Sequence, residues 1–478
     1  MTAVLAVASE VYPLIKTGGL ADVVGALPAA VRGFGIDMRV LVPGYPAVTA
    51  AVPAGDAVLE MEDLFGGPAR VIAGKAKGLD LLVLDAPHLF DRPGNPYLGP
   101  DGRDWPDNWR RFAALSLVAN DIARGAIASY VPAILHVHDW QAALAPVYLR
   151  HGEANAAKTV LTIHNLAFQG NFPPAIFGEL GLPAASFSIN GVEYYGGVSY
   201  LKGGLQFADA ITTVSPTYAE EICTRAGGMG LDGMIRARRN VLSGIVNGID
   251  TRVWDPATDD ALVALYDERT MNNRAANKRA LEDRFALKAS DGPIFCVISR
   301  LAWQKGMDLI GECIEGMVAQ GGRLAVLGSG EAALEGLFRG AATRHRGAVG
   351  VVTGYDESLA HLLQGGSDAI LIPSRFEPCG LTQFCGLRYG TVPVVSRVGG
   401  LADTIIDAND AALSAGVATG IQFLPVEAQA LGRAINQATA LYADRKTWRN
   451  IQRRGMRADV SWGKSAAKYA ALYKSLAA

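Results

Sequence analysis

The position in this sequence that most favours chemistry is that of a single glutamate, between an apolar run and a candidate helix start. Residues 369–372 (Ala-Ile-Leu-Ile) are typical of a buried parallel strand, and Gly380-Leu381-Thr382-Gln383 is typical of a helix start. Glu377 would then lie at the carboxyl end of a strand, where ligands bind in open α/β sheets. The backbone N–H groups of residues 380–382 would suit a phosphate group. The alternative is an ordinary loop whose glutamate faces solvent.

Two cations follow another apolar run. Residues 294–298 read as a strand, and Arg300 and Lys305 lie in the segment directly after it. The planar donor fork of an arginine and the point charge of a lysine can converge on one multiply charged anion. A solvated loop is the alternative, but Arg300 follows the strand so closely that we expect it near a ligand.

A Gly-Gly turn follows the first apolar run of the chain. In Lys16-Thr17-Gly18-Gly19-Leu20 the two glycines precede a helical pattern of apolar residues. Such a turn lets the backbone approach an anion closely, and Lys16 adds a positive charge. Chain reversal alone is the alternative. Residues 398–403 repeat the pattern, which suggests anion sites at both turns, although turn chemistry alone would produce the same pattern.

Polar side chains lie at the ends of two further apolar runs. His136 and His138 share a face because they are two residues apart, and with Asp139 they suggest a metal site, but no third ligand has the usual spacing. We therefore expect no metal there, and expect Asp139 to cap a helix or to accept from a hydroxyl. His164 ends the next run. Lys16, Asp139 and His164 would thus gather at one sheet edge, which favours a function over structural roles.

A glycine-rich segment offers a competing function. Gly328-Ser329-Gly330-Glu331-Ala332-Ala333 fits the dinucleotide pattern G-x-G-x-x-A, and Asp356 follows at the distance of a ribose-binding acid. The segment follows the second strand of its domain, whereas the fingerprint normally follows the first. An NAD(P)-dependent oxidoreductase is therefore the second hypothesis.

Composition excludes several classes of partner. The chain has 478 residues, 50% of them hydrophobic and 19% charged, with a net charge of −2 and no long basic run. This composition indicates a globular enzyme and argues against nucleic-acid binding. The N-terminus lacks a basic signal region, no stretch is apolar enough to span a bilayer, and the five cysteines show no metal spacing. We expect a cytoplasmic protein without a membrane or nucleic-acid partner.

Strand-like runs alternate with helical patterns, which predicts parallel, doubly wound sheets. The predicted strands are residues 3–8, 38–42, 81–84, 134–137, 160–165, 210–214 and 241–245, followed by 294–298, 323–327, 349–352, 369–372 and 392–395. Residues 44–80 are predicted to be irregular. An Asn-Gly turn at 247–248 marks a boundary. We predict an N-terminal domain at 1–245, a C-terminal domain at 246–456, and a helix within 457–478 that packs back on the first domain.

Several aromatic side chains lie where a ligand would be bound. Tyr97, Trp105 and Trp109 belong to a turn-rich segment that is predicted to form a surface loop. These rings would either stack on sugars or hold the loop in place. Tyr355 follows a predicted strand, where it would stack on a nucleobase or cover the core.

These motifs together resemble bacterial glycogen synthases and the related plant starch synthases. The resemblance rests on Lys16-Thr-Gly-Gly-Leu20, His138-Asp-Trp140, Thr162-Ile-His-Asn-Leu166, Asn247-Gly-Ile-Asp250, Ser299-Arg-Leu301 with Lys305-Gly306, and Pro373-Ser-Arg-Phe-Glu-Pro-Cys-Gly-Leu381. The matches keep their order along nearly the whole chain, and the first and last are highly specific. The resemblance implies a GT-B fold of two Rossmann-like doubly wound parallel-sheet domains facing across a deep cleft. It also implies transfer of glucose from ADP-glucose to the non-reducing end of an α-1,4-glucan, glycogen or a maltooligosaccharide, with retention and without a metal or cofactor.

The same resemblance assigns roles by position. Lys16, Gly18 and Gly19 would approach the donor phosphate and the acceptor. Arg300 and Lys305 would hold the distal phosphate, and the backbone of Leu381 and Thr382 would complete the diphosphate site. Tyr355 would stack on adenine. The residues around the transferred glucose would be Glu377, His164, Asp139 and Asn247.

One departure concerns the mechanism. Many retaining GT-B enzymes have a second glutamate eight residues after the first, where this chain has Cys385. Double displacement with Glu377 as nucleophile is one mechanism, by analogy with glycosidases. Direct front-side transfer is favoured because no paired carboxylate is visible. The missing carboxylate also motivates a third hypothesis, a non-catalytic protein that binds a nucleotide sugar or a glucan.

Overall fold

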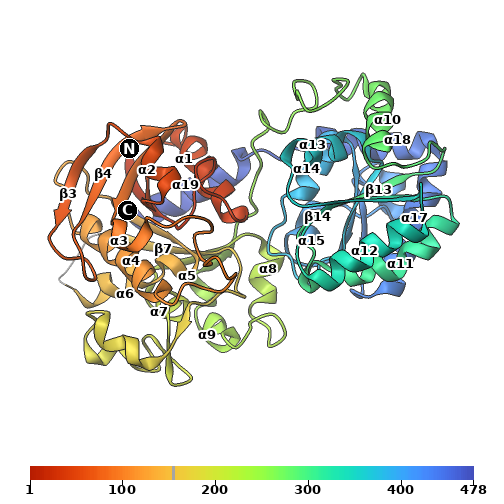
Figure 1. Ribbon diagram of the computed structural model, residues 1–478. Coiled ribbons are helices and arrows are strands. Elements are labelled where there is room, and N and C mark those ends of the chain that lie inside the picture. Colours follow the sequence, from red (N-terminus) through yellow and green to blue (C-terminus); the bar gives the residue numbers. More distant parts are fainter. Residues whose placement is uncertain (153–156) are drawn as a thin grey trace. The chain divides into compact units, whose positions relative to one another are not determined.

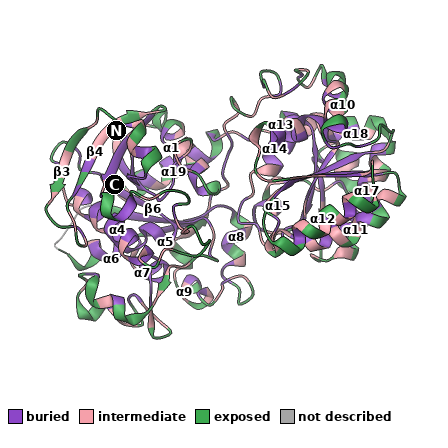
Figure 2. Cartoon of the chain, in the orientation of Figure 1, coloured by how far each residue is buried: buried purple, intermediate pink, exposed green. Residues whose placement is uncertain are grey.

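The computed structural model describes residues 1–152 and 157–478, and the chain divides into two compact units (Figure 1). Unit 1 comprises Met1–Asn247 and Trp462–Ala478, and unit 2 comprises Gly248–Ser461. Each unit is built around its own sheet, with buried strands in the middle and exposed residues on the outer helix faces (Figure 2).

Unit 1 contains a nine-stranded sheet in the order β12-β11-β7-β6-β1-β2-β5-β4-β3. The strands are β1 (Thr2–Val7), β2 (Ile36–Pro43), β3 (Asp56–Met61), β4 (Ala69–Ala76), β5 (Leu79–Asp85), β6 (Ile134–His138), β7 (Lys158–Ile163), β11 (Ala210–Thr213) and β12 (Leu242–Gly244). Neighbours from β12 to β5 are parallel, whereas β4 and β3 are antiparallel to their neighbours. The parallel strands are near-continuous apolar runs because helices cover both sheet faces.

Helices and a small second sheet complete unit 1. The helices are α1 (Gly19–Arg32), α2 (Pro46–Ala51), α3 (Pro87–Phe90), α4 (Asn108–Ala123), α5 (Asp139–Ala142), α6 (Leu144–His151), α7 (Tyr200–Phe207), α8 (Pro216–Glu221), α9 (Asp232–Ala237) and α19 (Gly463–Ala477). The small sheet joins β8 (Asn171–Phe172), β10 (Gly197–Ser199) and β9 (Glu193–Tyr194). Helix α19 packs against α1, β1 and β6, so the end of the chain belongs to unit 1.

Unit 2 contains a six-stranded parallel sheet in the order β15-β14-β13-β16-β17-β18. The strands are β13 (Ile294–Ile298), β14 (Arg323–Gly328), β15 (Val349–Thr353), β16 (Ala369–Ile372), β17 (Val392–Ser396) and β18 (Ile421–Phe423). The helices are α10 (Arg274–Arg284), α11 (Met307–Ala319), α12 (Ala332–Arg344), α13 (Glu357–Gly366), α14 (Thr382–Tyr389), α15 (Gly399–Thr404), α16 (Asp410–Ala415), α17 (Ala428–Ala443) and α18 (Arg445–Arg457).

Alternating side chains of the unit 2 strands enter two separate cores. Phe295 and Leu371 pack on one face, in the same core as residues of α11, α12 and α17. Cys296 and Ile370 pack on the other face, with residues of α10 and α13. Figure 1 shows α13 and α14 on the opposite side of this sheet from α11 and α12. The predicted doubly wound parallel sheets are therefore confirmed.

Both units reverse their strand order at one point. In unit 2, β13, β14 and β15 follow one another outward in one direction of the sheet, and β16 then lies on the other side of β13. In unit 1, β1, β2 and β5 follow one another outward in the sheet, and β6 then lies on the other side of β1. Ligands of open α/β sheets bind at such reversal points, beyond the carboxyl ends of the strands. The two points lie between β13 and β16 and between β1 and β6.

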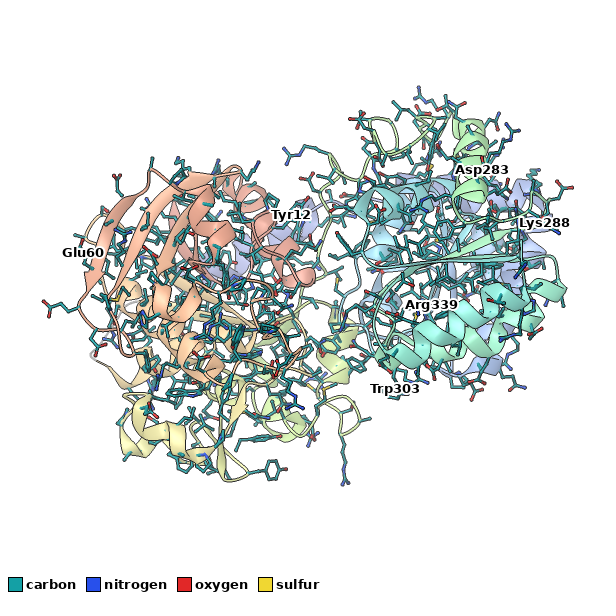
Figure 3. The ribbon with its side chains drawn as sticks, viewed as in Figure 1. Tyr12, Glu60, Asp283, Lys288, Trp303 and Arg339 are labelled. Carbon is teal, nitrogen blue, oxygen red and sulfur yellow. The ribbon has the colours of Figure 1, made fainter. Side chains whose placement is uncertain are left out.

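The prediction of irregular structure at residues 44–80 is wrong. This segment forms α2, β3 and β4, and β3 is the edge strand of the nine-stranded sheet. Most side chains of β3 are at least partly exposed, and Glu60 projects from it into solvent (Figure 3). An edge strand with charged, exposed side chains has no continuous apolar run, so the pattern that identified the buried strands was missing.

No helix in the described part of the chain is long and apolar enough to cross a membrane.

A buried arginine links several helices of unit 2 by hydrogen bonds. Arg274, on α10, is 9% exposed, and its guanidinium donates to the carbonyl oxygens of Gln364, Gly365 and Ser367 at the end of α13. It also donates to the Gly390 carbonyl at 2.7 Å and to the Thr391 hydroxyl at 2.9 Å. One side chain thus links α10 to the ends of α13 and α14, the helix that follows the Glu377 loop.

We expect Arg274→Ala to destabilise unit 2 by about 3 kcal/mol, because it leaves several buried carbonyl groups without donors. Thermal unfolding should show one transition shifted down. Arg279→Ala, on an exposed position of the same helix, is the matched control and should leave that transition in place. Equal melting of both variants would contradict this role.

Candidate active site

Glu377 lies at the strand reversal point of unit 2 and pairs with Lys305. The loop between β16 and α14 carries Glu377, and the loop between β13 and α11 carries Lys305. Lys305 Nζ donates to Glu377 Oε2 at 2.6 Å, and the Ser374 hydroxyl donates to the same oxygen at 2.8 Å. Glu377 is 7% exposed, so solvent screens this pair less than a surface pair. The structure brings these two predicted residues together and rejects the solvent-facing alternative for Glu377.

Backbone packing fixes the positions of the two loops that carry Lys305 and Glu377 relative to each other. Gly306 adopts a φ of +68°, and a Cβ at this position would lie 2.1 Å from the Pro373 carbonyl oxygen. The Arg375 N–H donates to the Gln304 carbonyl at 2.8 Å. The Arg375 guanidinium also holds Asp308, on α11, with two bonds of 2.8 and 2.7 Å. The contact between Lys305 and Glu377 therefore rests on a rigid frame rather than on two flexible loops.

The second Gly-Gly turn supports the Glu377 loop. The Gly400 N–H donates to the Glu377 carbonyl at 3.0 Å. A Cβ on Gly399 would lie 2.1 Å from that same oxygen, and a Cβ on Gly400 would lie 2.2 Å from the Cys379 carbonyl oxygen. Backbone atoms of the protein occupy the space that a side chain would need at these glycines. Close packing therefore explains the glycines of this turn, and an anion site there stays a prediction.

In the described part of the chain, no hydrogen bond joins the other predicted residues of unit 2 to the Lys305–Glu377 pair. Arg300 is exposed and makes no ion pair with any described residue. Tyr355 is 78% exposed, and its hydroxyl donates to Glu357 at 3.1 Å. Leu381 is the N-cap of α14 and Thr382 is its first residue, so their N–H groups have no acceptor within that helix.

The G-x-G-x-x-A segment has a structural explanation. A Cβ on Gly328 would lie 2.0 Å from the Ser299 carbonyl oxygen, and one on Gly330 would lie 2.2 Å from the Leu301 carbonyl oxygen. These glycines let the loop after β14 pack on the loop after β13. Asp356 accepts from the Leu359 N–H at 2.9 Å and caps α13. No feature of the segment requires a dinucleotide.

The first Gly-Gly turn differs from the second. Gly18 is the N-cap of α1 and Gly19 is its first residue, and a Cβ on Gly18 would meet no heavy atom within 4 Å. Packing does not explain this glycine, whereas close approach of a ligand would. Lys16, one turn earlier, is half-exposed and pairs with Asp22, on α1, at 2.8 Å.

Glu10 is a site residue that the sequence analysis missed. It follows β1 and is 3% exposed, and its carboxylate accepts hydrogen bonds from the N–H and hydroxyl of Thr17 and from the Tyr97 hydroxyl. Tyr97 therefore fastens the 91–107 loop to the segment that carries Lys16. The available signal is a charged residue that closely follows the first apolar run of the chain.

Asp139 and His164 lie together at the strand reversal point of unit 1. Asp139 Oδ1 accepts from the backbone N–H of His164 at 2.6 Å. Burial raises the pKa of Asp139 to about 7, although this hydrogen bond and one from the Asn165 N–H lower it. The helix cap of α5 is His138, so the expectation that Asp139 caps this helix is wrong. Asp139 adopts a φ of +53°, a rare conformation for a residue other than glycine that is found at functional sites.

His164 is a neutral side chain with a histidine partner. Its Nε2 lies 2.9 Å from His138 Nδ1, and burial lowers the pKa of His164 to about 3. His136, on the same strand face as His138, contacts Thr162 at 2.6 Å and the Tyr473 hydroxyl, on α19, at 2.7 Å. Within the described residues, no three His, Cys, Asp or Glu side chains are arranged to hold a metal ion.

Asn247 ends unit 1 with an unused acceptor. The side chain is 6% exposed, and its Oδ1 is buried without a hydrogen-bond partner among the described residues. Unpaired buried polar atoms are rare in folded proteins, and a ligand hydroxyl would satisfy this one.

Two family models match the chain, one in each unit. Residues 3–237 match the starch synthase catalytic domain, and residues 279–455 match the glycosyl transferases group 1 family. Both models describe glycosyltransferases, and each unit has a cluster of polar residues at its strand ends, where such an enzyme would bind its substrates.

Curated relatives align over the full length. A glycogen synthase of Mesorhizobium japonicum is 60% identical over 473 residues, covering 99% of this chain and 98% of that protein. A protein of Rhizobium meliloti named glycogen synthase 1 is 59% identical over 476 residues and covers 99% of both chains.

Solved structures agree with these relatives. The catalytic domain of starch synthase IV from Arabidopsis thaliana, bound to ADP and acarbose, has a TM-score of 0.89 at 31% identity, covering 100% of this chain and 99% of that one. A sucrose-phosphate synthase from Thermosynechococcus elongatus, at 18% identity, has a TM-score of 0.60, covers 100% of this chain and 99% of that one, and shares the fold. The two-domain α/β GT-B fold is thereby confirmed, and nothing supports an oxidoreductase. The chain belongs to the glycogen synthase family of glycosyltransferases.

Proposed function

We propose that this protein transfers glucose from ADP-glucose to the non-reducing 4-OH of an α-1,4-glucan, glycogen or a maltooligosaccharide, with retention of configuration and without a metal. The observation that carries the proposal is the buried Lys305–Glu377 pair at the strand reversal point of unit 2, in a chain whose full-length relatives are glycogen synthases. The proposed roles of individual residues follow from the charges that such a reaction develops.

Breaking a glycosyl phosphate bond builds negative charge on the leaving diphosphate. Arg300 and Lys305 supply two positive charges on the loop after β13, and the free N–H groups of Leu381 and Thr382 add partial positive charge. We propose that these groups bind the diphosphate and stabilise the charge that it acquires. Lys16 would contribute a positive charge from unit 1, beside the open backbone at Gly18.

The sugar develops positive charge and has hydroxyl groups to be oriented. Glu377 Oε2 already accepts from Lys305 and Ser374, which leaves Oε1 for the substrate. A carboxylate that is held by a lysine and a hydroxyl is a weakened nucleophile, so its charge serves better to stabilise the sugar cation or to orient a hydroxyl. Cys385 is 4% exposed on α14 and supplies no second carboxylate. Front-side transfer is therefore the proposed mechanism.

Unit 1 has acceptor atoms of its own for sugar hydroxyls. Asp139 and the unpaired Oδ1 of Asn247 can each accept from a sugar hydroxyl. His164 stays neutral around pH 7 and can donate or accept through its free ring nitrogen. We propose that these three side chains orient the transferred glucose.

We expect Lys305→Ala to lower kcat/KM by about 10²- to 10³-fold, because it removes a cation from the developing diphosphate charge. Glu377→Gln should lose activity as well, since a neutral amide cannot stabilise a sugar cation. The measurement is ADP release from ADP-glucose in the presence of glycogen. Arg339→Ala removes an ion-paired cation from the surface of the same unit and should retain activity (Figure 3). An active, folded Lys305→Ala would refute the proposed role of Lys305, and a folded wild-type protein that releases no ADP would refute the proposed reaction. Loss of turnover in the variant would exclude a non-catalytic binding protein.

We expect ADP-glucose to outcompete UDP-glucose, because the larger purine stacks better on the exposed ring of Tyr355. Tyr355→Ala should raise the KM for ADP-glucose about tenfold, in line with the stacking energy of a base on an aromatic side chain, and leave kcat nearly unchanged. Steady-state kinetics with both donors measures the effect. An unchanged donor preference in the variant would show that the ring does not contact the base.

We expect kcat/KM to rise with pH and to level off above about pH 7, because burial raises the pKa of Asp139 to about 7. The ionised form is the stronger acceptor for the two backbone N–H groups and for a sugar hydroxyl. Asp139→Asn should have low activity without this inflection. His164 should contribute no inflection above pH 5, since its pKa is about 3. A wild-type profile that is flat between pH 5 and 7 would contradict the assignment.

A further inference from the structure

A cavity within unit 1 lies outside the two residue clusters described above. Its volume is about 140 Å³, and it is lined by residues 92–96, residues 45–47, Ile15 and Arg111. All of these residues belong to the described part of unit 1. The lining contains two arginines and no carboxylate.

Arg111 is a buried cation without a counter-ion. Its side chain lies on α4, is 1% exposed, and forms no ion pair with any described residue. The guanidinium instead donates to three neutral oxygens, the carbonyls of Leu89 and Pro96 and the side-chain oxygen of Asn108, each at 2.8 Å. Burial lowers the pKa of Arg111, and the charge of Arg92 acts in the same direction, whereas the charge of Asp107 opposes the shift.

A second arginine lines the same cavity. Arg92 forms a two-pronged pair with Asp107, at 2.7 and 2.5 Å, which neutralises its own charge. Asp107 does not line the cavity, whereas Arg92 does. Arg111 is therefore the cavity-lining cation whose charge is not held in an ion pair within the described residues.

The Tyr45 hydroxyl is an unused donor at the same place. Tyr45 is 4% exposed and lines the cavity, and its hydroxyl has no hydrogen-bond partner among the residues that the structure describes. Burial raises the pKa of Tyr45, so the hydroxyl keeps its proton and can donate. Its ring packs edge-on against Phe90 with centroids 5.7 Å apart, which fixes the direction of the hydroxyl.

We propose that this cavity binds a small tetrahedral oxyanion, either orthophosphate or the phosphoryl group of a sugar phosphate. The anion would accept from the Tyr45 hydroxyl and neutralise the charge of Arg111. A cavity of about 150 Å³ accommodates a benzene molecule, so this one has room for a phosphoryl group but not for a nucleotide sugar. The site is therefore distinct from the donor site proposed above.

The test titrates orthophosphate into the full chain by calorimetry, in an Arg300→Ala/Lys305→Ala background that removes the proposed donor-phosphate contacts of unit 2. We expect this background to bind one phosphate. Adding Tyr45→Phe should weaken the binding about tenfold, the usual effect of losing a hydrogen bond to a charged group. The matched control is Tyr148→Phe, which removes another buried hydroxyl of unit 1, bonded to the Leu180 carbonyl at 2.8 Å, and should leave the affinity unchanged.

Melting temperatures separate binding from folding. In phosphate-free buffer, Tyr45→Phe should melt at or above the temperature of its parent because its hydroxyl has no partner, whereas Tyr148→Phe should melt lower. Phosphate should then raise the melting temperature of the parent more than that of Tyr45→Phe.

Titration with glucose 1-phosphate identifies the source of the anion. Tighter binding than orthophosphate, lost in Tyr45→Phe, would assign the site to a sugar phosphate, and binding of orthophosphate alone would assign it to the free ion. An affinity for phosphate that Tyr45→Phe leaves unchanged, or a background that binds neither anion, would overturn the proposal and assign the cavity to ordered water.

Discussion

Parallel strands end at the same edge of a sheet, and this constraint positions the functional residues of both units. A parallel sheet needs long connections, so each strand is followed by a loop and a helix at that edge. Where the strand order reverses, two such loops diverge and leave their side chains free for a ligand. Glu377 and Lys305 follow the two strands at the reversal in unit 2. Glu10 and Asp139 follow the two strands at the reversal in unit 1.

The buried pair of Lys305 and Glu377 shows how such a site is prepared. Taking two charges out of water is unfavourable unless their mutual attraction and further hydrogen bonds compensate. Here the Ser374 hydroxyl adds a third partner, and the loop frame around Gly306 and Arg375 keeps the charges in place. In the reaction proposed above, Lys305 would need little rearrangement to meet a phosphate, because it is already held in place beside a carboxylate. Preorganised charge of this kind is the main source of electrostatic catalysis.

The two Gly-Gly turns illustrate how one sequence pattern serves two physical purposes. Both precede a helix, and Gly18 and Gly399 occupy corresponding places in the motif. Around Gly399 and Gly400 the missing Cβ atoms make room for backbone carbonyls of the Glu377 loop. At Gly18 the corresponding space is open. The first turn can therefore admit a ligand, and the second holds the glutamate loop from behind.

Local patterns in the sequence determined the buried strands, the parallel class of both sheets and the strand-end positions of Lys305, Glu377, Asp139 and His164, because apolar runs and helix starts depend on neighbouring residues. The family could also be identified from the sequence, because each of its motifs is a contiguous run of residues. Only the tertiary structure decided what each polar group touches. The Glu10 contacts to Thr17 and Tyr97, the His138–His164 pair and the uncompensated charge of Arg111 join residues that are distant in the chain or on separate elements. Hydrogen bonds and desolvation act through space, so sequence spacing alone cannot specify them.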